Sequence, residues 1–155
     1  MSEFFDEPDA VASSASKLRD IPCTIGVVTS GATSGLFPAT NSTKVTNAHG
    51  VVTTIVLSSY QDRHFLLITQ TGKFGSLLTS WCEDRLDGSS KLYKSHVLLG
   101  KRDDELLNVF AKEIMQIISL RSTLPLLLSI ALDDENGRDA ETFKTILESV
   151  RALFS

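Results

Sequence analysis

The stretch that decides the fold is residues 64–81, which read HFLLITQTGKFGSLLTSW. Two runs rich in branched and aromatic residues, 64–70 and 75–81, stand on either side of Thr71-Gly72-Lys73. Such runs fit a pleated strand, and a glycine supplies the positive φ that a tight turn needs. The stretch therefore predicts two antiparallel strands that are joined by a turn at Gly72.

Further runs of strand-forming residues lie on both sides of this stretch. Val51 to Ser58 is another run of Val, Ile and Thr, which a polar turn separates from His64, so it is expected to extend the same meander. Tyr93 to Leu99 and Leu126 to Leu132 are further strand candidates. The last of these is almost continuously apolar, which is typical of a central strand that is covered on both faces.

The hydrophobic period changes from strand to helix after Asp103, which is expected to cap the first helix. Ser122 to Pro125 is expected to end that helix, because proline lacks an amide donor. A second helix is expected after Asp139. Apolar residues spaced three or four apart mark the core-facing stripes, with Leu106 or Leu107, Phe110, Ile114, Ile117 and Ile118 in the first helix and Phe143, Leu147, Val150 and Phe154 in the second.

This order of elements, strands followed by helix, strand and helix, indicates an α+β domain. We expect an antiparallel sheet of about five to six strands with two helices on one face. Residues 44–155 carry all of these elements and form the predicted domain. Residues 1–43 begin acidic, continue into a Gly/Ser/Thr-rich stretch with Pro38, and are interpreted as a flexible tail and a loop.

Both faces of the predicted sheet carry apolar residues, yet two helices cover about one face. Because large apolar patches are rare on soluble monomers, we expect the other face to bind a second sheet, or else to be covered by Ile21 to Thr29. Alternation gives one set with Val52, Val56, Phe65, Leu67 and Leu78, and an opposite set with Ile55, Leu57, Leu66, Ile68, Leu77 and Trp81. The candidate partner-binding residues from the strands are Ile55, Leu57, Leu66, Ile68 and Leu77.

Composition and motifs point away from catalysis and from several ligands. With 15 basic and 19 acidic residues and a formal net charge of −4, the chain lacks the positive field that nucleic acid requires. Gly72-Lys73 and Gly100-Lys101 lack the other residues of a phosphate loop, and the His and Cys residues are scattered. We therefore expect no enzyme, no cofactor and no metal. No apolar run reaches the ~20 residues of a membrane helix, so we expect no membrane partner. The first twenty residues do not match a signal peptide and the chain has two cysteines, so we expect an intracellular protein, in the cytoplasm and with the nucleus as a second compartment.

Five short stretches form a recognisable series. They are GVVTTIV at 50–56, LLITQTGKFGSL at 66–77, VLLG at 97–100, LNVFAK at 107–112 and LLLSIAL at 126–132. Taken together they resemble the proteasome assembly chaperone 3 family over residues 44–154. The hairpin and the spacing between VLLG and LNVFAK carry most of this resemblance.

The resemblance implies a non-enzymatic chaperone that pairs with proteasome assembly chaperone 4 and escorts α-subunits while the α-ring of the 20S proteasome forms. It also implies a domain that dimerises through its sheet with its helices outside. A homodimer is an alternative pairing, and a small dimeric scaffold or adaptor subunit of another complex is the alternative function. Gln70, Gly72, Lys73 and Gly75 match the family's turn, so Gln70 and Lys73 join the candidate contacts, while Lys73 as a mere solubilising residue is the other interpretation.

Overall fold

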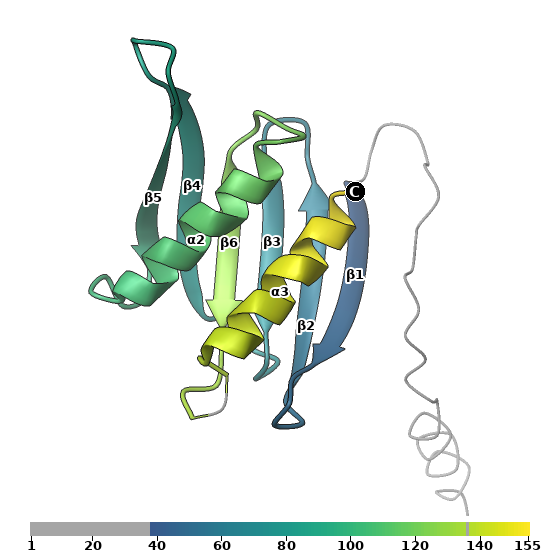
Figure 1. Cartoon of the computed structure of the whole chain (residues 1–155). Coiled ribbons are helices and arrows are strands. Elements are labelled where there is room, and N and C mark those ends of the chain that lie inside the picture. The colour runs from purple at the N-terminus through teal and green to yellow at the C-terminus, as the bar shows by residue number, and fades with distance from the viewer. Residues whose placement is uncertain (1–37, 136) are drawn as a thin grey trace, which may run out of the picture.

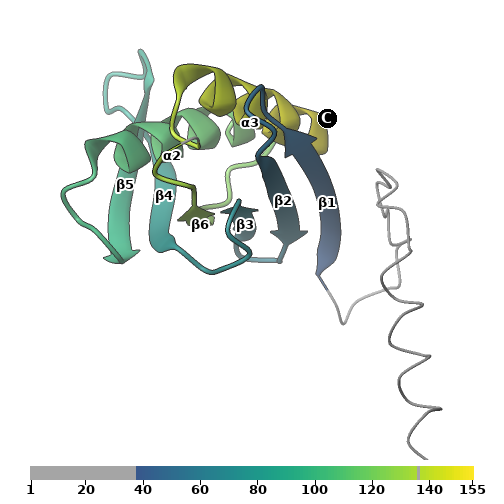
Figure 2. The ribbon, with the colours of Figure 1, turned by 90° about the horizontal axis from the view of Figure 1, so that it is seen from below.

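The computed structural model describes residues 38–135 and 137–155, in which one sheet is packed against two helices (Figure 1). The elements in chain order are β1 (Ala39–Thr46), β2 (Val52–Ser59), β3 (His64–Thr69), β4 (Ser76–Asp84), β5 (Lys91–Leu99), α2 (Glu105–Ile118), β6 (Leu126–Ala131) and α3 (Ala140–Leu153). Figure 2 shows both helices on the same side of the sheet. The expected α+β class, with its helices on one face, is confirmed. Neither α2 nor α3, at 14 residues each, is long and apolar enough to cross a membrane.

The order of strands across the sheet is β1-β2-β3-β6-β4-β5. β6 lies between β3 and β4, parallel to β3 and antiparallel to β4, so the sheet is mostly antiparallel with one parallel pair. The expected meander is therefore wrong at the turn around Gly72, because β3 and β4 are not neighbours. The central position of β6 agrees with its nearly continuous apolar sequence.

β1 is the element that the sequence analysis missed. Residues 39–43, which were expected to be a loop, pair with β2 from Ala39 opposite Ser59 to Thr43 opposite Ile55. The described sheet thus begins at Ala39 rather than Lys44. β1 is an edge strand rich in Thr, Asn and Ser, so it lacks the apolar alternation of a more buried strand. The expected tail and the segment Ile21 to Thr29 lie outside the described residues.

Both helices begin at an aspartate whose side chain accepts a hydrogen bond from the first turn. Asp104 accepts from the backbone N of Leu107 at 3.4 Å, one residue after the expected cap at Asp103. Asp139 accepts from the backbone N of Thr142 at 3.2 Å, as expected. The helices meet through Phe110 and Phe143, whose ring centroids are 4.6 Å apart. The caps set where each helix begins, and the aromatic contact joins the two helices in one layer over the sheet.

The core lies between this helix layer and one face of the sheet. Ile55, Leu57, Leu66 and Ile68 are at most 3% exposed there, although the sequence analysis assigned them to partner binding. That assignment is corrected, because side chains beneath the helices are out of reach of a second sheet. The β4 residues were also grouped with the wrong face, since Leu78 is the fully buried one and Leu77 points to the other side.

Candidate functional site

The face of the sheet opposite to the helices is not covered by any element of the described residues (Figure 2). We call it the open face. The register places Val56 beside Leu67, Leu67 beside Ser129, and Ser129 beside Leu77, so that these residues form one row across four strands. The apolar centre of the open face consists of the partly exposed side chains Val56, Phe65, Leu67, Leu77 and Leu127. A row of this kind can bind another apolar surface but carries no reactive group.

Polar side chains border this centre on the β4–β5 side. The indole N of Trp81 donates to Glu83 Oε1 at 2.7 Å, and Lys94 Nζ lies 2.6 Å from Glu83 Oε2. The hydrogen bonds from Lys94 and Trp81 hold the pKa of Glu83 below its usual value of 4.5. An apolar centre with a charged, hydrogen-bonded margin is the usual anatomy of a protein–protein interface.

Gln70, a predicted contact residue, has its side chain hydrogen-bonded within the domain. Its Nε2 donates to Thr53 Oγ1 at 3.0 Å, and its Oε1 accepts from the backbone N of Asp133 at 2.8 Å. The side chain therefore joins β2 to the segment that follows β6. Its amide is occupied in the free protein, so the structure assigns Gln70 an internal role.

Gly72 and Gly75, the two glycines in the turn between β3 and β4, have different roles. Gly72 has φ +70°, which confirms the expected bend. Gly75 is needed for close approach, since a Cβ there would lie 1.9 Å from the carbonyl O of Ile130. Lys73, between them, is exposed, as is Phe74 at 62%. Phe74 stacks on Phe65 of the open face with ring centroids 6.0 Å apart.

Gln70 and Leu77 are partly exposed and Lys73 is exposed. Because the Gln70 amide is hydrogen-bonded within the domain, Leu77 in the apolar centre and Lys73 in the turn are the candidate contacts that remain available to a partner. Sequence reasoning missed Phe74 as a member of the site. An exposed aromatic inside a Gly-flanked turn was the available signal, but its stacking partner, nine residues earlier in the chain, is visible only in three dimensions.

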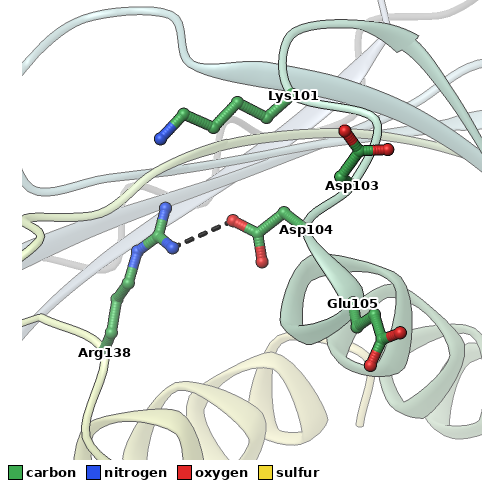
Figure 3. A pocket seen from close by; sticks show the side chains of 5 residues that line it. All are labelled: Lys101, Asp103, Asp104, Glu105 and Arg138. Atoms are coloured by element: carbon green, nitrogen blue, oxygen red, sulfur yellow. Dashed lines mark hydrogen bonds and ion pairs between the residues drawn. The ribbon is translucent and has the colours of Figure 1, made fainter.

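A polar hollow of about 630 Å³ lies near the start of α2 (Figure 3). Asp104 Oδ2 is 2.9 Å from Arg138 Nη1, while its Oδ1 caps α2, so both of its oxygens are engaged. Arg138 also pairs with Asp134, at 3.2 Å. The Asp104–Arg138 pair ties the start of α2 to the loop before α3, and the Asp134–Arg138 pair lies within that loop. Over residues 38–135 and 137–155, no group of three His, Cys, Asp or Glu side chains is placed to hold a metal.

Comparison with known proteins identifies a family to which this chain is similar. The family model described as proteasome assembly chaperone 3 matches residues 66–153. Proteasome assembly chaperone 3 of Mus musculus is 30% identical over 100 residues, which cover 63% of this chain and 81% of the mouse protein. The Homo sapiens protein of the same name is 30% identical over 104 residues, covering 66% of this chain and 82% of that protein.

The fold is also found in a crystal structure of a chaperone complex for yeast 20S proteasome assembly. The TM-score is 0.60 at 13% sequence identity, with 75% of this chain and 98% of that chain covered. At this identity the likeness establishes the shared fold. The family match spans most of β3, all of β4, β5 and β6, and both helices. The chain therefore belongs to the proteasome assembly chaperone 3 family, a family of non-catalytic assembly chaperones.

Proposed function

We propose that this protein is a chaperone of proteasome assembly that acts by binding alone. Its open face pairs with the sheet of proteasome assembly chaperone 4, and the pair holds α-type subunits while the α-ring of the 20S proteasome forms. Family membership supports the assembly role, and the likeness in fold to a chain of a chaperone complex for yeast 20S proteasome assembly supports action as part of a complex.

The observation that carries this proposal is the apolar centre of the open face. Strands lie about 4.8 Å apart and rise about 3.3 Å per residue, so a sheet of six strands with six to nine residues each presents a face on the order of 600 to 700 Å² in projection. A standard protein–protein interface buries about 800 Å² on each partner. The open face is thus close to the size that one partner sheet covers.

Sheet-to-sheet pairing leaves the helix layer on the outside of the complex. The outer surface of α2, where Leu106 and Val109 are 40% and 57% exposed, then stays accessible to a client subunit. A chaperone that covers the ring surface which β-subunits later occupy is released by steric competition, without chemistry. We place this activity in the cytoplasm, with the nucleus as a second compartment.

The test is co-expression with proteasome assembly chaperone 4, followed by light scattering of the purified product and mass spectrometry of what it captures from cell extract. We expect a heterodimer that recovers α-type subunits. Leu77→Asp, in the apolar centre, should abolish the pairing and leave the circular dichroism spectrum unchanged. Leu106→Asp is the matched control for pairing alone, because it places the same charge on the outer side of α2, away from the open face.

A stable monomer that recovers no α-type subunits would contradict the proposal. A homodimer without the second chaperone would replace the proposed partner by a second copy. Recovery of an unrelated complex would favour the adaptor alternative. Equal effects of Leu77→Asp and Leu106→Asp on pairing would show that the open face is not the contact.

A further inference from the structure

We propose that the open face binds its partner through a raised aromatic knob, Phe74 stacked on Phe65, and that Gln70 is the positioning residue that holds this knob in place. The inference rests on the proposed function, because it assigns a contact within the same open face. Its partner is the sheet of the second chaperone, which must offer an apolar recess for one aromatic ring.

The position of Phe74 follows from the geometry of β3. Phe65 is close to the beginning of the strand and Thr69 is its last residue, so their Cα atoms are about 13 Å apart at a rise of ~3.3 Å per residue. Phe74 comes after Thr69, yet its ring centroid is 6.0 Å from that of Phe65, with 12° between the planes. The side chain of Phe74 therefore folds back along the open face instead of pointing away from the sheet.

Phe74 remains 62% exposed in this position. An aromatic side chain held in one orientation with most of its surface in water is typical of an interface anchor, because its burial yields much contact area for few frozen torsions. The ring lies above the apolar centre, so a partner that covers this centre must accommodate it. Because the Phe74 ring adjoins the apolar centre, the partner sheet that covers this centre also contacts Phe74.

Hydrogen bonds fix the backbone from which Phe74 extends. Thr69 Oγ1 donates to the carbonyl O of Lys73 at 3.0 Å, which closes the turn. Gln70 ties the start of the turn to the rest of the domain three times, through its backbone N to Ala131, its Nε2 to Thr53 and its Oε1 to the N of Asp133. The Gln70 side chain is the link between the turn and β2.

Two glycines show that the space around the Gln70 side chain and the turn is tightly filled. A Cβ on Gly137 would lie 1.9 Å from Gln70 Oε1, and a Cβ on Gly75 would lie 1.9 Å from the carbonyl O of Ile130. The turn therefore has no room to slide along the end of β6. Gln70 acts by preorganisation, since an anchor that is already ordered loses less entropy on binding.

The test is a double-mutant cycle on the affinity for purified proteasome assembly chaperone 4, measured by calorimetry. Phe74→Ala should weaken binding at least about tenfold, as truncation of an anchor does. Gln70→Ala should weaken it roughly three- to tenfold, but should add no loss in the Phe74→Ala background, because Gln70 acts through Phe74. Ser122→Ala is the control: it also removes two side-chain hydrogen bonds, to His64 and to the N of Leu124, and should bind like the wild type.

A second readout needs no partner. The nuclear Overhauser effect between the rings of Phe65 and Phe74 should be present in the wild type and in Ser122→Ala, and lost in Gln70→Ala. Additive losses in the double variant, or a retained ring contact in Gln70→Ala, would overturn the positioning role. Tighter binding by Phe74→Ala would show that the ring is a cover and not an anchor. Absence of wild-type binding would overturn the proposed pairing, and the ring contact would then test Gln70 by itself.

Discussion

The two faces of the sheet carry similar apolar residues, but only one of them is covered. Ile68 is fully buried beneath the helices, whereas Leu67, its neighbour in the chain, is partly exposed on the open face. Both are aliphatic residues of the same strand, β3. The difference shows that an apolar strand pattern demands a cover on both sides without saying what the cover is. Here one cover belongs to the chain itself, and we attribute the other to a second protein.

The largest expected effect is the loss of stability when a charge is placed on the covered face. Ile68→Asp places an unpaired carboxylate in the core, which should cost about 4 kcal/mol or more. Since small domains have about 5 to 15 kcal/mol of stability in total, we expect loss of a cooperative thermal transition, measured by circular dichroism. A folded Ile68→Asp protein would contradict the arrangement of the two faces.

Moving the same charge by one residue tests the open face. Leu67→Asp should keep the helix signal and a thermal midpoint close to the wild type, because the carboxylate still reaches water. Pairing with the second sheet should weaken roughly 100-fold, as an unpaired charge in a dry interface requires. Size-exclusion chromatography and calorimetry check this. If Leu67→Asp unfolds as Ile68→Asp does, the open face is part of the core.

A smaller effect is expected where the chain passes from β3 to β4 over the end of β6. Gly75→Ala forces a methyl group against the carbonyl of Ile130 and should lower the free energy of unfolding by about 1 to 3 kcal/mol. Gly72→Ala is the comparison, because Gly72 has open space around it and only its φ of +70° is unfavourable for alanine. Its cost should be about 1 kcal/mol. Urea titrations measure both, and a larger loss for Gly72→Ala would contradict the close approach at Gly75.

The smallest expected effect is a pH dependence of stability from His64, on the covered face. His64 is 7% exposed, its ring nitrogens meet the hydroxyls of Ser59 at 3.1 Å and Ser122 at 2.8 Å, and burial lowers its pKa below 6.5. The unfolded chain therefore binds a proton at a higher pH than the folded chain does. Stability should be complete above pH 6.5 and should fall as the pH falls from 6.5 towards the lower folded pKa.

Thermal midpoints between pH 7.5 and 5.5 measure this decline. His64→Gln should reduce it, although it will also change the baseline stability. A decline in His64→Gln that is the same as in the wild type would assign it to other groups.

Much of the fold could be predicted because long periodic runs specify strands and helices locally. The cap at Asp139 and the bend at Gly72 have local causes and are where the sequence indicates. β1 was missed because the polar residues of an edge strand resemble a loop. The central position of β6 was predicted from its apolar sequence, but its neighbours β3 and β4 were not, because they are set by pairing over a long distance in sequence.

The candidate site was harder to predict for a related reason. Alternation within each strand sorted the residues correctly, but it does not say which set meets the helices. Alternation within β3 and within β4 does not show which residues of the two strands share a face, because a turn separates them. Leu77 was therefore grouped with Ile68, although it lies in the same row as Leu67. Phe74 could not be placed at all, since its position depends on the Gln70 hydrogen bonds to β2 and to the segment after β6.

The central position of β6 has a consequence for how the protein is made. β6 is the last strand in the sequence, yet it joins β1-β2-β3 on one side to β4-β5 on the other. During synthesis on a ribosome, the edges of β3 and β4 that pair with β6 therefore stay unpaired until residues 126–131 have been made. A product that stops before residue 126 lacks the strand that joins β3 to β4, so it leaves the edges of both partial sheets unpaired.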